Sequence, residues 1–192
     1  MPLTLPRLPD LQAMPTRPEY IAPQRINRAP SLWVASGLPW VSVMLASLAA
    51  FSPVIASAPV VPPLAFVLFL AWRLLRPGLL PVWAGLPLGA FDDLFSGQPF
   101  GSGVVLWSSA MLAMDAIDNR LLWRSFAQDW GVACVLIAAY LALAATIAGL
   151  AAGYPLPLVI GPQLLVTLAL YPIVTRFVAL LDRIRLLPLR TV

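Results

Sequence analysis

The segment Gly85-Leu-Pro-Leu-Gly-Ala-Phe-Asp-Asp-Leu-Phe-Ser-Gly-Gln-Pro-Phe-Gly101 interrupts an apolar stretch with two adjacent acids and a Ser-Gly-Gln-Pro turn. Pro/Gly clusters of this kind mark turns. The segment lies near the middle of residues 77–119, an interval of 43 residues without arginine. Because a membrane span needs about 20 apolar residues, this interval predicts two membrane-spanning helices joined by a turn.

The arginines divide the rest of the chain in the same way. Two more arginine-free intervals, 29–72 and 125–175, contain 44 and 51 residues, and each has a Pro-rich or Gly/Pro-rich turn near its middle. Positive residues accumulate on cytoplasmic loops, so we predict three hairpins with both termini and all arginine clusters in the cytoplasm. The predicted spans are 32–52, 60–75, 79–95, 103–119, 130–152 and 157–178.

The composition agrees with a chain that lies mostly in lipid. Hydrophobic residues make up 60% and charged residues 10% of the chain, whereas a soluble domain carries about 25% charged residues. We therefore predict an all-α polytopic membrane protein with its transmembrane domain over 31–185 and a cytoplasmic end over 186–192. The Pro- and Arg-rich residues 1–30 predict a disordered cytoplasmic tail that contacts lipid or only sets orientation. This placement explains the positive net charge without nucleic acid.

Two acids within the third predicted span need a structural explanation. Acids in membranes normally face protein or water and have a partner. Gly85, Gly89 and Asp93 recur every four residues and share one helix face, on which the glycines allow close approach of another helix. Asp92 points away from that face. We expect Asp93 to cap backbone amides of the turn or of the fourth helix, with a ligand or partner contact as the alternative.

Other ionisable residues give a weaker signal. Asp115 and Asp118 lie three residues apart before Arg120 and Arg124, which predicts local ion pairs or, alternatively, a cytoplasmic docking surface. The chain has no histidine or lysine, and Cys134 is the single cysteine. We therefore expect no catalytic activity, no metal site and no cofactor.

The spacing of the first segment resembles one known family. The pattern G-xxx-G-xxx-D-xx-SG-xxx-G, formed by Gly85, Gly89, Asp93, Ser96, Gly97 and Gly101, resembles the bacterial rod shape-determining MreD family. Tyr171-Pro172 in the last span, with a basic end after it, is similar to that family, as is the short second span. Asp92 departs from the family, in which that position is usually apolar.

The resemblance implies a non-catalytic scaffold in the bacterial inner membrane. Such a scaffold binds MreC and links a glycosyltransferase and a penicillin-binding transpeptidase to cytoplasmic MreB filaments. The resemblance also implies a six-helix fold similar to the substrate-binding subunits of energy-coupling-factor vitamin transporters. It places the Gly85–Gly101 block, Tyr171 and Pro172 at helix or partner interfaces.

The fold similarity supplies a rival function, the small-molecule-binding subunit of a transporter. A ligand pocket needs several convergent polar groups. Besides the acids, we count Ser57, Gln98, Ser102 and Tyr154 as the polar residues near the outer surface, and this low density favours the scaffold. An enzyme acting on lipid-linked precursors is disfavoured because histidine and lysine are absent.

Overall fold

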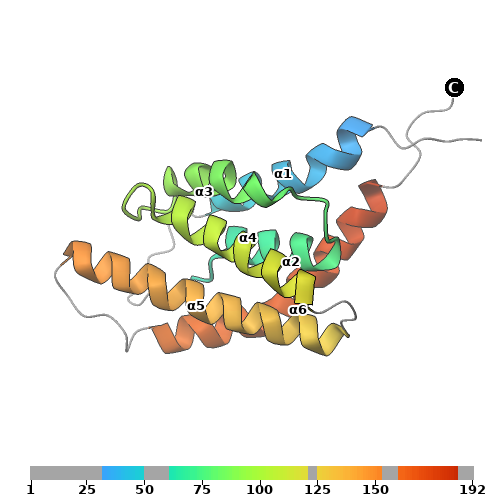
Figure 1. Ribbon diagram of the computed structural model, residues 1–192. Helices are drawn as coiled ribbons and strands as arrows, with labels where there is room; N and C mark the ends of the chain where they lie inside the picture. Colours follow the sequence, from blue (N-terminus) through green and yellow to red (C-terminus); the bar gives the residue numbers. More distant parts are fainter. Residues whose placement is uncertain (1–31, 50–60, 121–124, 153–159, 186–192) are drawn as a thin grey trace, which may run out of the picture.

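The computed structural model describes residues 32–49, 61–120, 125–152 and 160–185 (Figure 1). These residues form six α-helices and a short 3-10 helix, and none of them lies in a strand, which confirms the all-α class. The elements are α1 (Leu32–Leu48), α2 (Leu64–Leu75), η3 (Val82–Ala84), α3 (Gly85–Asp93), α4 (Ser102–Arg120), α5 (Phe126–Ala152) and α6 (Ile160–Arg185).

Each α-helix coincides with one predicted span, although the ends differ. The third span was predicted to start at residue 79, but Pro81 has an extended backbone with ψ 155°, so the helical chain begins at Val82 with η3. The last helix was predicted to end at 178 but continues to Arg185. The tails 1–30 and 186–192 lie outside the described residues.

Two helices, α6 and residues Phe126–Leu150 of α5, are long and apolar enough to cross a membrane. At about 1.5 Å per residue, the 26 residues of α6 extend ~39 Å, beyond the roughly 30 Å of a hydrocarbon core. Both helices expose their apolar residues, since only 33% of the most apolar stretch of α5 and 17% of that of α6 are buried. A core helix of a soluble protein would be mostly buried.

Helix α2 lies at the centre of the bundle. Its sequence, LAFVLFLAWRLL, is apolar on all sides, and a helix with this pattern is normally enclosed. Ten of its 12 residues, Ala65–Leu74, are buried. The other five α-helices form a closed ring in the order α1, α3, α4, α5, α6, in which each contacts the next and α6 contacts α1 (Figure 1).

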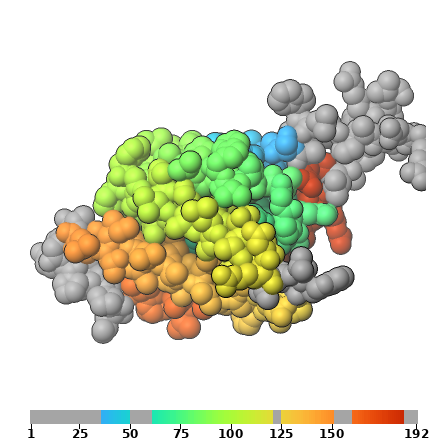
Figure 2. Space-filling model, viewed as in Figure 1, coloured from blue at the N-terminus to red at the C-terminus, as the bar shows by residue number. Residues whose placement is uncertain are grey.

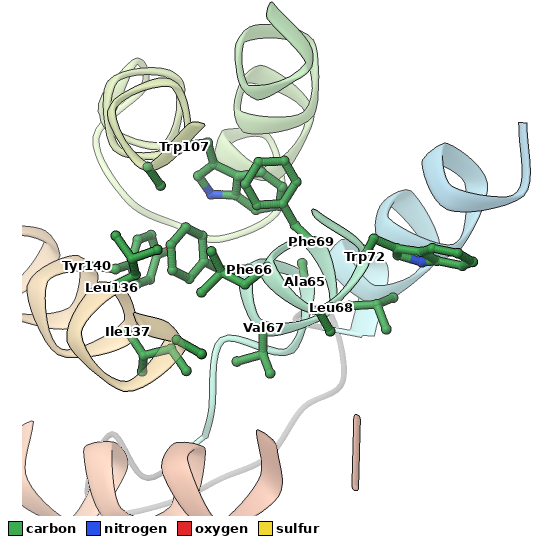
Figure 3. Packing of buried hydrophobic residues seen from close by; sticks show 14 of the residues in the cluster. Ala65, Phe66, Val67, Leu68, Phe69, Trp72, Trp107, Leu136, Ile137 and Tyr140 are labelled. Carbon is green, nitrogen blue, oxygen red and sulfur yellow. The ribbon is translucent and has the colours of Figure 1, made fainter. Parts of the chain in front are cut away.

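Aromatic side chains of α2 connect it to three helices of this ring (Figure 3). The ring of Phe66 stacks on Tyr140 of α5 with centroids 3.9 Å apart, and Phe69 lies 4.8 Å from Trp107 of α4. On another side, Trp72 donates from Nε1 to the Ser42 hydroxyl of α1 at 2.9 Å. Such ring pairs contribute about 0.5–1.5 kcal/mol beyond burial. In the space-filling view, side chains of α3, α4 and α5 make up most of the visible face (Figure 2).

Candidate functional site

The glycine face of α3 packs directly on α4. A Cβ atom added to Gly89 would lie 2.5 Å from the carbonyl oxygen of Gly103, and one added to Gly85 would lie 2.8 Å from that of Trp107. Both distances are shorter than any contact a real Cβ makes. Gly85 and Gly89 therefore serve helix packing within the chain, and α4 occupies the face that was also considered for a partner.

Asp93, at the end of α3, caps the N-terminus of α4. Its Oδ2 accepts a hydrogen bond from Gly101 N at 2.8 Å, and its Oδ1 accepts one from Gly103 N at 2.7 Å. Val104 N donates a longer bond to Oδ2 at 3.3 Å. The first four N–H groups of a helix have no partner inside the helix, and the carboxylate satisfies several of them. The capping role predicted for Asp93 is confirmed.

The second half of the block forms the turn between α3 and α4. Gly97 and Gly101 have φ values of 68° and 95°, which side chains with a Cβ rarely adopt. These two glycines are therefore needed for backbone conformation, whereas Gly85 and Gly89 are needed for close packing. Ser96 precedes the turn, and its hydroxyl oxygen is buried without a hydrogen-bond partner among the described residues.

A cavity of about 290 Å³ lies beside this turn, near the start of α2. Its polar lining residues come from α1, α3, the α3–α4 turn, α5 and α6. They are Ser47, Asp92, Ser96, Gln98, Tyr140 and Gln163. The stacked rings of Phe66 and Tyr140 contribute to an apolar part of the wall. Asp92 points away from the glycine face, as predicted from its position, and lines this cavity, which we call the outer cavity.

Asp92 is the charged residue of the outer cavity and is 7% exposed. The Ser47 hydroxyl interacts with its carboxylate, and it is buried without a hydrogen bond of good geometry among the described residues. The Gln98 carbonyl oxygen accepts from the Ser102 hydroxyl at 3.3 Å. Gln163 donates to the Val61 carbonyl oxygen at 2.7 Å, which joins α6 to the segment before α2.

More polar side chains gather at the outer cavity than was expected from the sequence for this end of the bundle. That expectation counted polar residues in the turns and missed Ser47 in the last turn of α1 and Gln163 in the first turn of α6. Both could have been found by extending the count one turn into each helix. Tyr140 lies well inside α5, and only the fold brings it to the cavity.

Ion pairs connect α2 to α4 at the other end of the bundle. Arg73 Nη1 lies 2.7 Å from Asp118 Oδ2, and its Nη2 lies 3.9 Å from Asp115 Oδ1. Arg73 is buried, with only 5% of its surface exposed. The acids pair across helices with Arg73, an interaction that the local prediction with Arg120 and Arg124 did not include. Arg120 is exposed, and Arg124 lies outside the described residues.

A second group of ion pairs connects α2 to α6. Arg76 donates from Nε and Nη2 to Asp182 Oδ2 at 2.8 and 2.6 Å. Arg185 lies 3.0 Å from Oδ1 of the same carboxylate. The structure thus gathers arginines from separate predicted cytoplasmic clusters at one end of α2, whereas the outer cavity lies at the other end.

Tyr171 and Pro172 lie in the middle of α6. Tyr171 is 2% exposed and belongs to the hydrophobic core. Pro172 is half-buried within the helix and cannot donate the usual backbone hydrogen bond. The Thr175 hydroxyl donates to the Tyr171 carbonyl oxygen at 2.9 Å. The pair therefore contributes to core packing and to the local geometry of α6.

The described residues contain no group of three or more histidine, cysteine or acidic side chains placed to hold a metal ion. The chemistry that the candidate site offers is hydrogen bonding and the charge of one buried carboxylate. No family model, curated protein or solved structure matches this chain.

Proposed function

We propose that this chain is a non-catalytic membrane scaffold of the bacterial cell-elongation machinery. In this role it binds MreC and links the wall-building glycosyltransferase and transpeptidase to MreB filaments. The observation that carries the proposal is the folding of the Gly85–Gly101 block, on which the resemblance to MreD rests. Gly89 and Asp93 each meet a tight geometric requirement there, as Gly97 and Gly101 do in the turn. A chance match to the pattern would not be expected to give five of its six positions a role in packing, capping or the turn.

The proposed scaffold crosses the bacterial inner membrane six times with both termini in the cytoplasm. Arg73, Arg76 and Arg185 gather at one end of the bundle through ion pairs, and this supports the one-sided distribution of positive charge. The exposed apolar faces of α5 and α6 support contact with lipid. The short α2 is compatible with this topology because protein, not lipid, surrounds it.

The outer cavity favours a second candidate function, the substrate-binding subunit of a small-molecule transporter. Six polar side chains converge on it, and convergence of this kind is typical of ligand pockets. The scaffold remains our first proposal because the sequence block supports it, whereas a cavity of this kind is compatible with either function.

Affinity purification of the tagged chain from native membranes, followed by mass spectrometry, tests the two functions. The scaffold predicts enrichment of MreC and of the elongation synthases over a tagged, unrelated multi-spanning protein of similar abundance. Enrichment of ATPase subunits and a membrane coupling subunit, without MreC, would refute the scaffold and support the transporter.

A further inference from the structure

The outer cavity combines the buried carboxyl group of Asp92 with two buried hydroxyl groups that make no hydrogen bond of good geometry within the described part of the chain. No cationic side chain is among the described residues that line it. Burial of an unpaired carboxylate is unfavourable, and acids kept within membrane proteins commonly serve a function. The hydroxyl oxygens of Ser47 and Ser96 are buried and unpartnered within the described part of the chain. Asp92, Ser47 and Ser96 therefore offer three acceptor side chains to a bound group.

These acceptors match the hydrogen-bonding capacity of a primary ammonium group, which has three N–H donors and one positive charge. A phosphate or carboxylate ligand would meet like charge and no arginine. A divalent metal ion would find one carboxylate where Ca²⁺ normally takes several oxygen ligands.

We propose that the outer cavity binds a small primary ammonium compound, with its nitrogen against Asp92 and the hydroxyls of Ser47 and Ser96. The volume of about 290 Å³ is at the lower end of the range for ligand pockets, about 300–1,000 Å³, and suits a small molecule or a headgroup. The same ammonium occurs in soluble amines and in phosphatidylethanolamine. This inference is compatible with either the scaffold or the transporter function. Its binding test can therefore fail or succeed independently of the affinity purification that tests those functions.

Thermal unfolding of the purified full chain in detergent micelles without ethanolamine lipid tests the site. The probe is ethanolammonium chloride, and the control is ethylene glycol with sodium chloride at the same concentrations. Asp92→Asn removes the negative charge from the cavity, and Asp115→Asn is the matched change at the other end of the bundle. We expect the probe to stabilise the wild type and Asp115→Asn, since a ligand that binds only the folded state raises the unfolding temperature.

Asp92→Asn should weaken the apparent affinity for the probe about ten- to a hundredfold. This factor corresponds to the free energy of one hydrogen bond to a charged group. Ala46→Leu keeps Asp92 but fills part of the cavity from α1, so it should weaken binding too and decides the test if Asp92→Asn does not fold. Where the probe stabilises the wild type, equal stabilisation of Asp92→Asn and Asp115→Asn, or an unchanged response of Ala46→Leu, would overturn the proposal. Equal stabilisation by ethylene glycol would do the same.

Nanodiscs of phosphatidylglycerol, with and without phosphatidylethanolamine, distinguish the two sources of the ammonium group. Stabilisation in micelles by the soluble probe assigns the site to a soluble amine. Stabilisation only by phosphatidylethanolamine, again lost in Asp92→Asn but not in Asp115→Asn, assigns it to the lipid headgroup. If neither source stabilises the wild type, the cavity does not bind this class of ligand and the inference is wrong.

Discussion

Replacing Gly89 by alanine tests whether α3 and α4 pack backbone against backbone. The added Cβ would lie 2.5 Å from the Gly103 carbonyl oxygen, and an ordinary contact begins at 3.4 Å. The helices must therefore separate by about 0.9 Å at this point, the difference between those two distances. The Asp93–Gly103 hydrogen bond, 2.7 Å long, would lengthen by a similar amount and be lost or much weakened.

The cost of this substitution follows from three contributions. Overpacking costs about 1–3 kcal/mol, and loss of a helix cap costs about 0.5–2 kcal/mol. Alanine is the better helix former by about 1 kcal/mol, which offsets part of the loss. We therefore expect Gly89→Ala to lower the free energy of unfolding by about 0.5–4 kcal/mol.

Gly131→Ala is the matched control, because a Cβ at Gly131 in α5 meets nothing within 4 Å. It should leave stability unchanged or raise it by up to about 1 kcal/mol. The assay is reversible unfolding of both variants in mixed micelles, followed by circular dichroism. If Gly89→Ala is as stable as Gly131→Ala, the close packing of α3 on α4 is wrong.

Three further predictions concern the charged residues. Asp93→Ala should lower the free energy of unfolding by about 1–3 kcal/mol, since the amides at the start of α4 lose their cap; circular dichroism melts measure this, and an unchanged midpoint would contradict the cap. Asp118→Ala should cost about 3–5 kcal/mol because it leaves the buried Arg73 guanidinium without the carboxylate that lies 2.7 Å away, and a double-mutant cycle of the two residues should show strong coupling, whereas additive losses would exclude the pair. Reporter fusions after Arg76 should give a cytoplasmic signal and fusions after Gly97 a periplasmic one, and the reverse result would refute the proposed topology.

Local patterns in the sequence were sufficient to locate the helices. Apolar runs between Pro/Gly clusters indicated six helices, and the structure has an α-helix at each position. The four-residue spacing of Gly85, Gly89 and Asp93 indicated a shared face, and that face meets α4. These predictions succeeded because periodicity and turn chemistry depend on neighbouring residues only.

Contacts between distant helices could not be predicted in the same way. Asp118 pairs with Arg73, which lies 45 positions earlier in the chain, although Arg120 is much closer to Asp118 in sequence. This pairing forms because α2 lies inside the ring of helices beside α4, and no local sequence pattern specifies that position. The outer cavity has the same origin, since Ser47, Tyr140 and Gln163 come from three helices.

The central position of α2 accounts for polar groups at both ends of the bundle. Its 12 residues extend ~18 Å at about 1.5 Å per residue, which is about 12 Å less than a hydrocarbon core of about 30 Å. The ring helices α5 and α6 are long enough to cross that core, and in the proposed topology α2 lies between these longer helices. At one end, the buried Arg73 pairs with carboxylates of α4, and the half-exposed Arg76 pairs with the buried Asp182 of α6. At the other end, Asp92 and its hydroxyl neighbours surround a cavity where α2 begins. The ion pairs and the outer cavity are therefore two consequences of one feature, a short helix enclosed by longer ones.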